Sequence, residues 1–250
     1  MIVSWQNKYI FVHSRKTAGS SIVVSLSRNL GPDDLVLSAI KEIVEAKIQL
    51  PDKVIQTALR TKPISVLFAR YLKSEKYSEA ISKGVKKAYM PSLGKKPQHA
   101  PAEKIRNTFP REWEEFTKFS VVRNPFDKTV SDYFWITKGS PNPPDFSTYV
   151  HALRDGDKLD GQVPIAHHDN WKSYSIDGCL ALDYYVRYES LQKYLINFCN
   201  EAGIEYDGWL PNSKGKIRKV RDYRDMYDSN TRSIVADLYG PEIESMGYTF

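Results

Sequence analysis

Residues 13 to 21 of this 250-residue chain place arginine, lysine, hydroxyl side chains and one glycine between two apolar segments. Tyr9 to Val12 are aromatic or β-branched, which predicts a short buried strand. Ile22 to Leu26 suit a buried helix. Backbone N–H groups at a helix start and a lysine charge both favour anions, so the segment predicts a phosphate-binding loop. Its candidate contacts are Arg15, Lys16, Thr17, Ala18, Gly19, Ser20 and Ser21.

This loop differs from the common phosphate-binding pattern G-x-x-x-x-G-K-[ST]. No glycine shortly precedes Lys16, and Gly19 follows it. A basic loop that is simply solvated surface is therefore an alternative interpretation. A role of Ser20 or Ser21 as the N-cap of the helix is a second one, and it is compatible with anion binding.

A second basic junction follows Phe119 to Val122, which also predicts a buried strand. Asn124 and Pro125 suit the N-cap and the first position of a helix. Arg123 and Ser131 are eight residues apart, so two helical turns can bring both side chains to one anion. Arginine holds phosphate through two parallel hydrogen bonds. Two such junctions predict a ligand with two phosphate groups. The alternative interpretation is that Arg123 forms an ion pair and that Ser131 is an ordinary helix serine.

The order and separation of the two motifs resemble those of the sulfotransferases that use 3′-phosphoadenosine 5′-phosphosulfate (PAPS). The similarity is to the carbohydrate branch, of the Golgi and heparan 2-O types, and to its bacterial relatives. H-x-x-K-T-A-G-S-S resembles their 5′-phosphosulfate loop, and F-S-V-V-R-N-P-F-D-K-T-V-S-D-Y resembles their 3′-phosphate motif. Further similarities occur at 99–102, at 186–191 and in the last residues, and the similarity is weakest over 31–95.

The resemblance implies a helix-rich α/β fold in which helices flank a parallel sheet in three layers, of the P-loop-nucleotide-hydrolase-like sulfotransferase kind. It implies one sulfotransferase domain over residues 1–250, with a helical insertion at about 31–95 that contributes to the acceptor site. The implied reaction is in-line transfer of a sulfuryl group from PAPS to a hydroxyl of a carbohydrate or small-molecule acceptor. The product nucleotide is 3′-phosphoadenosine 5′-phosphate, and no metal takes part.

The acceptor hydroxyl needs a general base, and histidine suits this role because its ordinary pKa is close to neutral. His99 lies between Pro97 and Pro101 in a loop, at the place where the resemblance implies the catalytic base. Lys16 is the candidate that stabilises the leaving phosphate. Glu103 and Asp132 are alternative bases. The structural alternative for His99 is a loop histidine that caps the next helix.

The resemblance also implies nucleotide contacts outside the two motifs, from a tyrosine after the third strand and from a basic loop near the C-terminus. The corresponding residues are Tyr188, Lys214, Lys216 and Arg218. Three further residues are candidates for the acceptor site. Each also has a structural interpretation, which is a strand end for His13, a helix start for His167 and a buried core position for Trp171.

The net charge of +6 is concentrated, since residues 60–120 contain 14 Lys or Arg and 6 Asp or Glu. Such an excess favours anionic ligands, including an anionic acceptor. No recognisable nucleic-acid-binding module is present. No apolar stretch is long enough to predict a membrane span, and the first residues lack a signal-peptide pattern, so we expect a cytoplasmic protein. Cys179 and Cys199 lack metal-ligand spacing and are expected to be buried thiols.

Alternation of strands and helices predicts a parallel sheet covered on both faces, with ligands at the carboxyl ends of its strands. The predicted strands are 8–13, 118–122 and 183–187. The predicted helices are 19–29, nearly all of 33–89, 101–107, 125–137, 189–202 and 229–238, with loops at 90–101 and around 141–144 and a turn at Gly240-Pro241.

Two other functions remain open from the sequence. A P-loop-type kinase would need magnesium and an acidic metal ligand at a strand end, and none stands out. A non-catalytic module that binds polyanions is supported by charge alone.

Overall fold

The computed structural model describes residues 1–61, 65, 74–156, 170–211 and 222–250. The chain forms two compact units. The first comprises Met1–Ser14, Ala18–Val121 and Lys172–Ser213, and the second comprises Arg15–Thr17, Val122–Trp171 and Lys214–Phe250.

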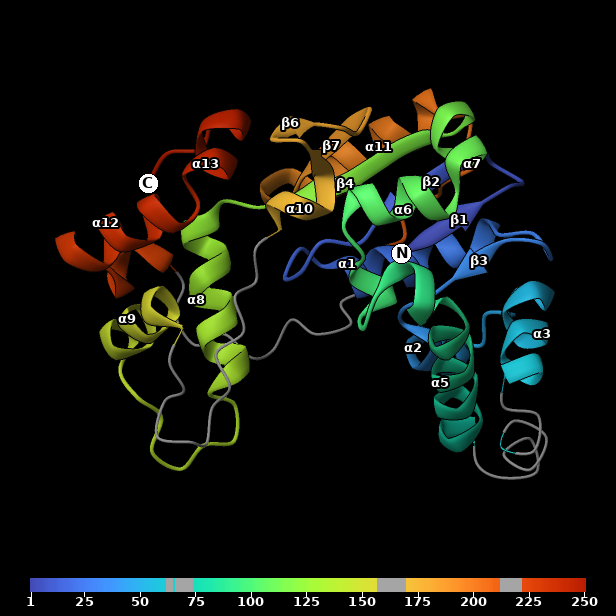
Figure 1. Ribbon diagram of the computed structural model, residues 1–250, viewed down its shortest axis with the longest axis horizontal. Coiled ribbons are helices and arrows are strands. Elements are labelled where there is room, and N and C mark those ends of the chain that lie inside the picture. Colours follow the sequence, from blue (N-terminus) through green and yellow to red (C-terminus); the bar gives the residue numbers. More distant parts are fainter. Residues whose placement is uncertain (62–64, 66–73, 157–169, 212–221) are drawn as a thin grey trace. The chain divides into compact units, whose positions relative to one another are not determined.

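The first unit contains a five-stranded sheet and most of the helices (Figure 1). The sheet consists of β1 (Ile2–Ser4), β2 (Tyr9–Val12), β3 (Leu35–Val36), β4 (Thr117–Val122) and β7 (Tyr184–Arg187), and β5 (Ser175–Ile176) pairs with β6 (Cys179–Leu180). The helices are α1 (Gly19–Leu26), α2 (Ile40–Glu45), α3 (Asp52–Thr61), α5 (Ser74–Leu93), α6 (Ala102–Thr108), α7 (Pro110–Glu115), α10 (Trp171–Tyr174) and α11 (Leu191–Glu201). Short 3-10 turns lie at Ser27–Asn29, Pro97–His99 and Tyr188–Ser190.

The sheet is mixed, with the strand order β3-β1-β2-β4-β7. β1 is antiparallel to both neighbours, since Ile2 pairs with Phe11 of β2 and with Val36 of β3. β2 and β4 are parallel, with Phe11 opposite Phe119. The α/β class is thus confirmed, but the expectation of a wholly parallel sheet is wrong. The segment between β1 and β2 is too short for a crossover and can only form a hairpin turn.

The middle of the sheet is held by aromatic packing. All four residues of β2 are buried, as expected for a central strand covered on both faces. The ring centroids of Phe11 and Phe119 lie 4.9 Å apart, and those of Phe119 and Phe198 of α11 lie 3.9 Å apart. This packing fixes β2 and β4, the two strands that precede the basic segments of the sequence.

Helices α2, α3 and α5 pack together in the region predicted to be helical over 33–89 (Figure 1). That prediction is wrong at Leu35 and Val36, because these residues extend the sheet by pairing with β1. α3 and α5 approach closely at Ala58 and Gly84, where a Cβ on Gly84 would lie 2.8 Å from the Cα of Ala58. The Thr61 hydroxyl donates to the Gly84 carbonyl at 2.8 Å across the same contact.

Most other predicted elements of the first unit are confirmed within a few residues. They are the first strand (β2), the first helix (α1 and the turn after it), 101–107 (α6), 118–122 (β4), 183–187 (β7) and 189–202 (α11). The expected loop at 90–101 begins later, because α5 continues to Leu93 despite Pro91 and ends at Gly94 with φ 88°. The sequence did not predict β1, β3, β5, β6, α7 or α10.

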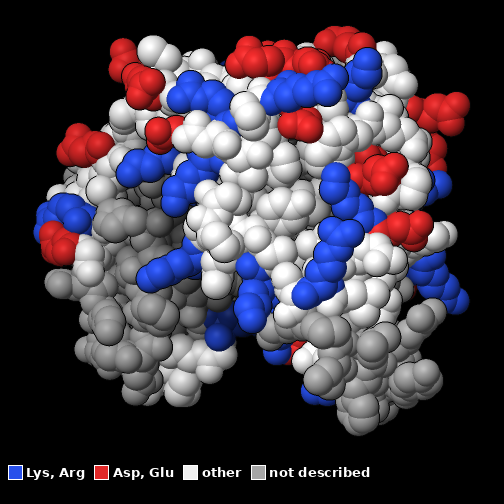
Figure 2. Space-filling view, turned by 45° about the vertical axis from the view of Figure 1, so that its right-hand side comes forward, with Lys and Arg blue, Asp and Glu red and all other residues white. Residues whose placement is uncertain are grey.

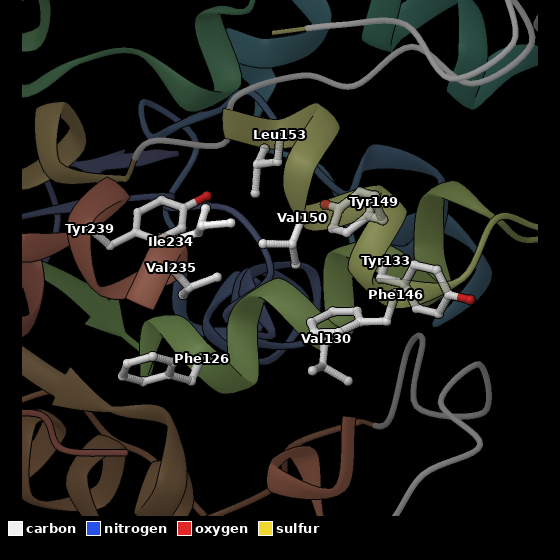
Figure 3. Packing of buried hydrophobic residues seen from close by; sticks show 10 residues of the cluster. All are labelled: Phe126, Val130, Tyr133, Phe146, Tyr149, Val150, Leu153, Ile234, Val235 and Tyr239. Atoms are coloured by element: carbon white, nitrogen blue, oxygen red, sulfur yellow. The ribbon is translucent and has the colours of Figure 1, made fainter. Parts of the chain in front are cut away.

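The second unit is helical, with α8 (Pro125–Ile136), α9 (Phe146–Asp155), α12 (Ser229–Leu238), α13 (Gly240–Met246) and a 3-10 turn at Tyr223–Met226. Figure 3 shows its core, in which Phe126, Val130 and Tyr133 lie along one face of α8 and meet side chains of α9 and α12. Helices predicted at 125–137 and 229–238 are confirmed. α9 was not predicted, and the turn expected at Gly240-Pro241 is wrong, because Pro241 occupies the first turn of α13, where proline is tolerated.

Replacing Gly84 with alanine should lower the free energy of unfolding by about 1–3 kcal/mol, because the new Cβ must displace the backbone of α3. This loss outweighs the gain of about 1 kcal/mol that alanine brings to a helix interior. Urea denaturation measures the change. Lys87→Ala, at an exposed position of the same helix, is the control and should change stability by less than about 0.5 kcal/mol. A Gly84→Ala variant more stable than the unsubstituted chain would contradict the close packing of α3 on α5.

Candidate functional site

The two basic segments leave the sheet from neighbouring strand ends. β2 and β4 are parallel, with Val12 opposite Ser120, so their carboxyl ends lie at the same edge. The Ser120 hydroxyl donates to the Val12 carbonyl at 2.8 Å, and the Ser14 hydroxyl donates to the Val121 carbonyl at 2.5 Å. Because these hydroxyls hold the strand ends together, they fix the points from which the loop after β2 and Arg123 begin.

The loop between β2 and α1 contains two non-glycine residues with a left-handed backbone, Lys16 at φ 60° and Ala18 at φ 59°. This conformation costs an L residue roughly 1–2 kcal/mol, and such strain concentrates at functional sites. Ala18 is the N-cap of α1 and makes no side-chain capping bond, while Ser20 and Ser21 lie inside the helix. The alternative that one of these serines is the N-cap is therefore wrong.

His13 and Gly19 are complementary in shape. A Cβ on Gly19 would lie 1.9 Å from Nε2 of His13, so the imidazole occupies the space that any larger residue at 19 would need. The His13 ring is buried, stacks on Phe11 and lies 3.0 Å from the Ser38 hydroxyl through Nδ1. Glycine at position 19 is thus required by close packing rather than by its backbone angles.

His99 ends the 3-10 turn Pro97–His99 and is half-buried. Its Nδ1 lies 2.8 Å from the backbone carbonyl of His13, and the two rings meet edge to face at 4.5 Å. A carbonyl only accepts hydrogen bonds, so Nδ1 carries the proton in this contact. In the neutral ring the lone pair then resides on Nε2, the tautomer that a general base at Nε2 requires.

Asn170 of the second unit holds the backbone of Arg15, and the sequence did not point to it. Its side-chain oxygen accepts from the Arg15 N–H at 2.8 Å, and its side-chain nitrogen donates to the Arg15 carbonyl at 2.9 Å. The Asn170 side chain is buried. The primary amide of Asn170 pairs with the N–H and the C=O of Arg15, as the backbone of a neighbouring β-strand does. Nothing in the sequence next to either residue reveals this pairing.

Arg123 joins the two basic segments inside the second unit. Its Nη1 donates to the Lys16 carbonyl at 2.7 Å, and its Nε donates to Asp127 at 2.7 Å. The arginine is 5% exposed, so both contacts are shielded from water. The expected N-cap is confirmed, since the Asn124 side chain accepts from the Phe126 N–H at 3.0 Å and Pro125 begins α8.

Lys16 extends over an exposed aromatic ring of α8. Its Nζ lies 4.7 Å from the centroid of Trp135, which is 42% exposed, and Nζ of Lys138 lies 6.0 Å from the same ring. Ser131, one helical turn before Trp135, is partly exposed. Cation–π attraction of this kind restrains the lysine without removing its charge.

Asp132 is a buried carboxyl within this basic region. Desolvation raises its pKa from 3.8 to about 6, and the cations Lys128, Lys16, Arg123 and Arg15 oppose that rise. Its Oδ1 has no hydrogen-bond partner among the residues that the structure describes. Burial also lowers the pKa of Arg15, an effect that Asp132 partly offsets.

A second buried charge pair lies one helical turn before Asp132 on α8. Nζ of Lys128 is 3.6 Å from Glu242 of α13 and 4.0 Å from the centroid of Tyr239. Both residues of the pair are fully buried. Because removing one partner would leave an uncompensated charge, the pair ties α13 to α8.

The remaining sequence candidates belong to different elements of the chain. Thr17 is buried, Tyr188 is half-exposed in the 3-10 turn after β7, and Trp171 is half-buried at the start of α10. His167, Lys214, Lys216 and Arg218 lie outside the described residues. Cys199 is buried, and burial raises the pKa of its thiol to about 12. Cys179 is exposed, so the expectation of a buried thiol there is wrong, because both residues of β6 face solvent.

The basic surface is interrupted by acidic residues. Figure 2 shows Lys and Arg side chains at several places on the face drawn, with Asp and Glu among them in its upper part. Lys83 pairs with Glu79 at 2.5 Å, and Lys118 pairs with Asp183 at 2.9 Å. Some of the lysines in the basic region of the sequence are therefore partly neutralised by neighbouring carboxylates.

The chain matches no protein-family model, and no curated protein is significantly similar to it. Within the described ranges, no helix has the length and apolar character needed to cross a membrane. The same residues contain no group of three or more His, Cys, Asp or Glu that could hold a metal ion.

Replacing Gly19 with alanine should lower the free energy of unfolding by about 1–3 kcal/mol, because the buried His13 ring must move. The loss should shrink in a His13→Ala background, where the new methyl group finds space. Chemical denaturation of the two single variants and the double variant forms the cycle that measures this coupling. Gly240→Ala is the control, since nothing lies within 4 Å of a Cβ there. Equal losses from Gly19→Ala in both backgrounds would contradict the proposed clash.

Proposed function

We propose that this chain is a sulfotransferase that transfers a sulfuryl group from PAPS to a hydroxyl group of a carbohydrate or small-molecule acceptor. The proposal includes the finer fold assignment, a P-loop-like sulfotransferase fold. Two anion-binding segments at the carboxyl ends of adjacent parallel strands are compatible with that assignment.

The hydrogen bond from Arg123 to the Lys16 carbonyl carries the proposal. Lys16 belongs to the segment that resembles a 5′-phosphosulfate loop, and Arg123 begins the segment that resembles a 3′-phosphate motif. The 2.7 Å contact brings Lys16 and Arg123 together within the second unit, which supports the proposal that the two motifs bind one ligand. A nucleotide with phosphate groups on both its 3′ and its 5′ oxygens would use both segments at once.

The side chains of this locality suit a ligand with several negative charges. Arg15, Lys16 and Arg123 all act electrostatically on Asp132, so three cations gather around one buried carboxyl. Arg123 is buried and Arg15 and Lys16 are partly buried, and such cations form charge-assisted hydrogen bonds with phosphate oxygens. The proposal assigns the 5′-phosphate to the loop around Lys16 and the 3′-phosphate to Arg123 and Ser131.

When bound, PAPS would supply a sulfuryl group open to in-line attack by the acceptor oxygen, with the 5′-phosphate as the leaving group. Lys16 assists this step by placing its ammonium near the phosphate oxygen on which charge develops. Arg123 holds the carbonyl of Lys16 and so restrains the backbone from which that ammonium extends. Trp135 restrains the other end of the side chain through its ring.

His99 acts as the general base in this proposal. Its Nδ1–H bond to the His13 carbonyl fixes the tautomer, so Nε2 takes the proton that leaves the acceptor hydroxyl. His13 is three residues before Lys16 in the chain, which limits the separation of their Cα atoms to roughly 11 Å. The assignment of His99 and Lys16 to one reaction rests on this continuity of the chain.

Calorimetric titration with adenosine 3′,5′-bisphosphate, 5′-AMP and ADP, with and without magnesium, tests the nucleotide assignment. We expect tight binding of the bisphosphate without magnesium and weaker binding of the other two by at least about 10-fold, because a charge-assisted phosphate contact contributes about 1.5–3 kcal/mol. Preference for ADP with magnesium would indicate a kinase instead. Salt-sensitive binding of any polyanion, with no preference for a 3′-phosphate, would indicate a non-catalytic module.

Substitutions distinguish residues that bind the nucleotide from residues that act in the chemical step, once kcat is measured with an acceptor that the protein sulfates. Arg123→Lys should weaken bisphosphate binding about 10- to 100-fold, because lysine cannot make the two parallel contacts. His99→Ala should lower kcat about 10²- to 10⁴-fold and leave nucleotide affinity unchanged. Lys16→Ala should lower kcat about 10²- to 10³-fold.

His151→Ala is the matched control, since His151 lies on α9 against Asn230 at 3.1 Å and takes no part in the proposal. Near-normal turnover of His99→Ala would show that another group is the base. Unchanged bisphosphate affinity of Arg123→Lys would remove the assignment of the 3′-phosphate.

A further inference from the structure

Asp132 is a buried ionisable group to which the reaction proposed above assigns no role. It lies on α8 with 2% of its surface exposed, and its Oδ1 has no hydrogen-bond partner among the described residues. Burying an ionised carboxyl without a partner is costly, so such groups either acquire a counter-charge or bind a proton. The surroundings of Asp132 allow both states.

The counter-charges come from three segments of the second unit. Lys128 precedes Asp132 by one turn on α8, Arg123 stands at the start of that helix, and Arg15 and Lys16 belong to the loop. Lys128 also has Glu242 as a partner, and Arg123 has Asp127. Asp132 therefore shares its four cations with two other carboxylates, and their attraction does not fully offset the cost of its burial, because its pKa still lies at about 6.

A dianion placed among the same cations would compete directly with Asp132. Its negative charge cancels the field that favours the ionised carboxylate, and like charges close together cannot both remain ionised in a buried site. The carboxyl would then bind a proton more readily than it does in the ligand-free protein.

We propose that Asp132 is the counterion of the Arg15, Lys16 and Arg123 cluster, and that it takes up one proton from solvent when a phosphate or sulfate dianion binds there. The carboxylate balances the cations while the anion is absent, and the neutral carboxylic acid removes the repulsion once the anion is present. Only an O–H bond forms, and the proton comes from the buffer. Asp132 is a positioning residue in this role. The inference rests on the proposed function in one respect, which is that the cluster binds a phosphate or sulfate dianion.

The neighbours of Asp132 make it the group expected to titrate near neutrality. Tyr149 of α9 interacts electrostatically with it, and burial raises the pKa of this tyrosine well above its ordinary value, with Asp132 contributing, so Tyr149 stays neutral. Lys128 forms an ion pair with Glu242, and arginine does not lose its proton in this range. Among the side chains that act on it electrostatically, we therefore assign proton uptake between pH 6 and 8 to Asp132, and the Asp132→Asn variant distinguishes this uptake from uptake by His99.

The sign of the pH effect follows from this assignment. Below about pH 6 the carboxyl already carries a proton, so anion binding needs none. Above that pH, binding must draw a proton from solvent, and affinity should fall by up to about 10-fold per pH unit until the pKa of the complex is reached. The unsubstituted protein therefore binds dianions best in mildly acidic solution.

Isothermal titration calorimetry of the full chain tests the coupling, with inorganic sulfate and adenosine 3′,5′-bisphosphate as probes. Sulfate stays a dianion over the whole range, so it contributes no proton of its own. Titrations at pH 5.5 and 7.5, each in two buffers of different ionisation enthalpy, give the number of protons taken up. We expect roughly 0.5 to 1 proton at pH 7.5 and much less at pH 5.5, as a midpoint near 6 requires.

Asp132→Asn should abolish the uptake, flatten the pH dependence and strengthen sulfate binding at pH 7.5 by about 10-fold or more. Asp237→Asn, an exposed carboxyl on α12 of the same unit, is the control and should behave like the unsubstituted chain. If Asp132→Asn does not fold, carbon-13 carboxyl shifts of the unsubstituted protein replace it. One aspartate should then titrate near pH 6, with a midpoint that rises when sulfate is added.

The inference would be overturned if proton uptake persists in the Asp132→Asn variant. It would also be overturned if the unsubstituted chain takes up no proton at pH 7.5. Tight bisphosphate binding without proton uptake would overturn it while leaving the proposed function intact. Sulfate binding with uptake, combined with no preference for the 3′-phosphate, would support the inference and contradict the proposed function. Failure of both anions to bind would overturn both.

Discussion

Helix α8 buries charge on part of its surface while another face packs into an apolar core. Arg123, Asp127, Lys128 and Asp132 are all buried at or near this helix. Isolated charges cannot be buried at acceptable cost, so each needs an opposite charge or hydrogen-bond partner. The partners come from elsewhere in the chain: Arg123 reaches the Lys16 carbonyl, and Lys128 reaches Glu242 of α13. Charge compensation around one helix thus ties the loop of residues 15–17 and the C-terminal helix to the same unit.

This requirement explains why the candidate site is both stable and chemically unusual. A loop with left-handed Lys16 would be costly in isolation, but Arg123 binds the backbone at Lys16 and Asn170 binds it at Arg15. The same compensation is incomplete at Asp132, where one oxygen has no partner among the described residues. Incomplete compensation makes this carboxylate ready to bind a proton, and a neutral Asp132 leaves the surrounding cations to an incoming anion, as our proposals for nucleotide binding and proton uptake both require.

The first unit contributes rigidity of a different kind. Aromatic packing of Phe11, Phe119 and Phe198 fixes the central strands, and the hydroxyls of Ser14 and Ser120 hold their ends. The His13 carbonyl then orients His99, while the His13 ring fills the space left by the missing side chain of Gly19. A single histidine that is mainly structural therefore positions the histidine proposed as the base.

The sequence by itself determined the local elements around the candidate site. Strand-forming runs before the two basic segments, Asn124 and Pro125 at the start of α8, and the positions of Lys16, Arg123 and His99 all follow from short-range patterns. Only the tertiary structure decided the pairing of β1 between β2 and β3, the fit of His13 against Gly19, the hold of Asn170 on Arg15 and the burial of Asp132. Asn170 and Arg15 are far apart in the chain, and the period of a helix or strand carries no information about such contacts. Burial and charge compensation depend on which distant segments meet, so they exist only in the folded chain.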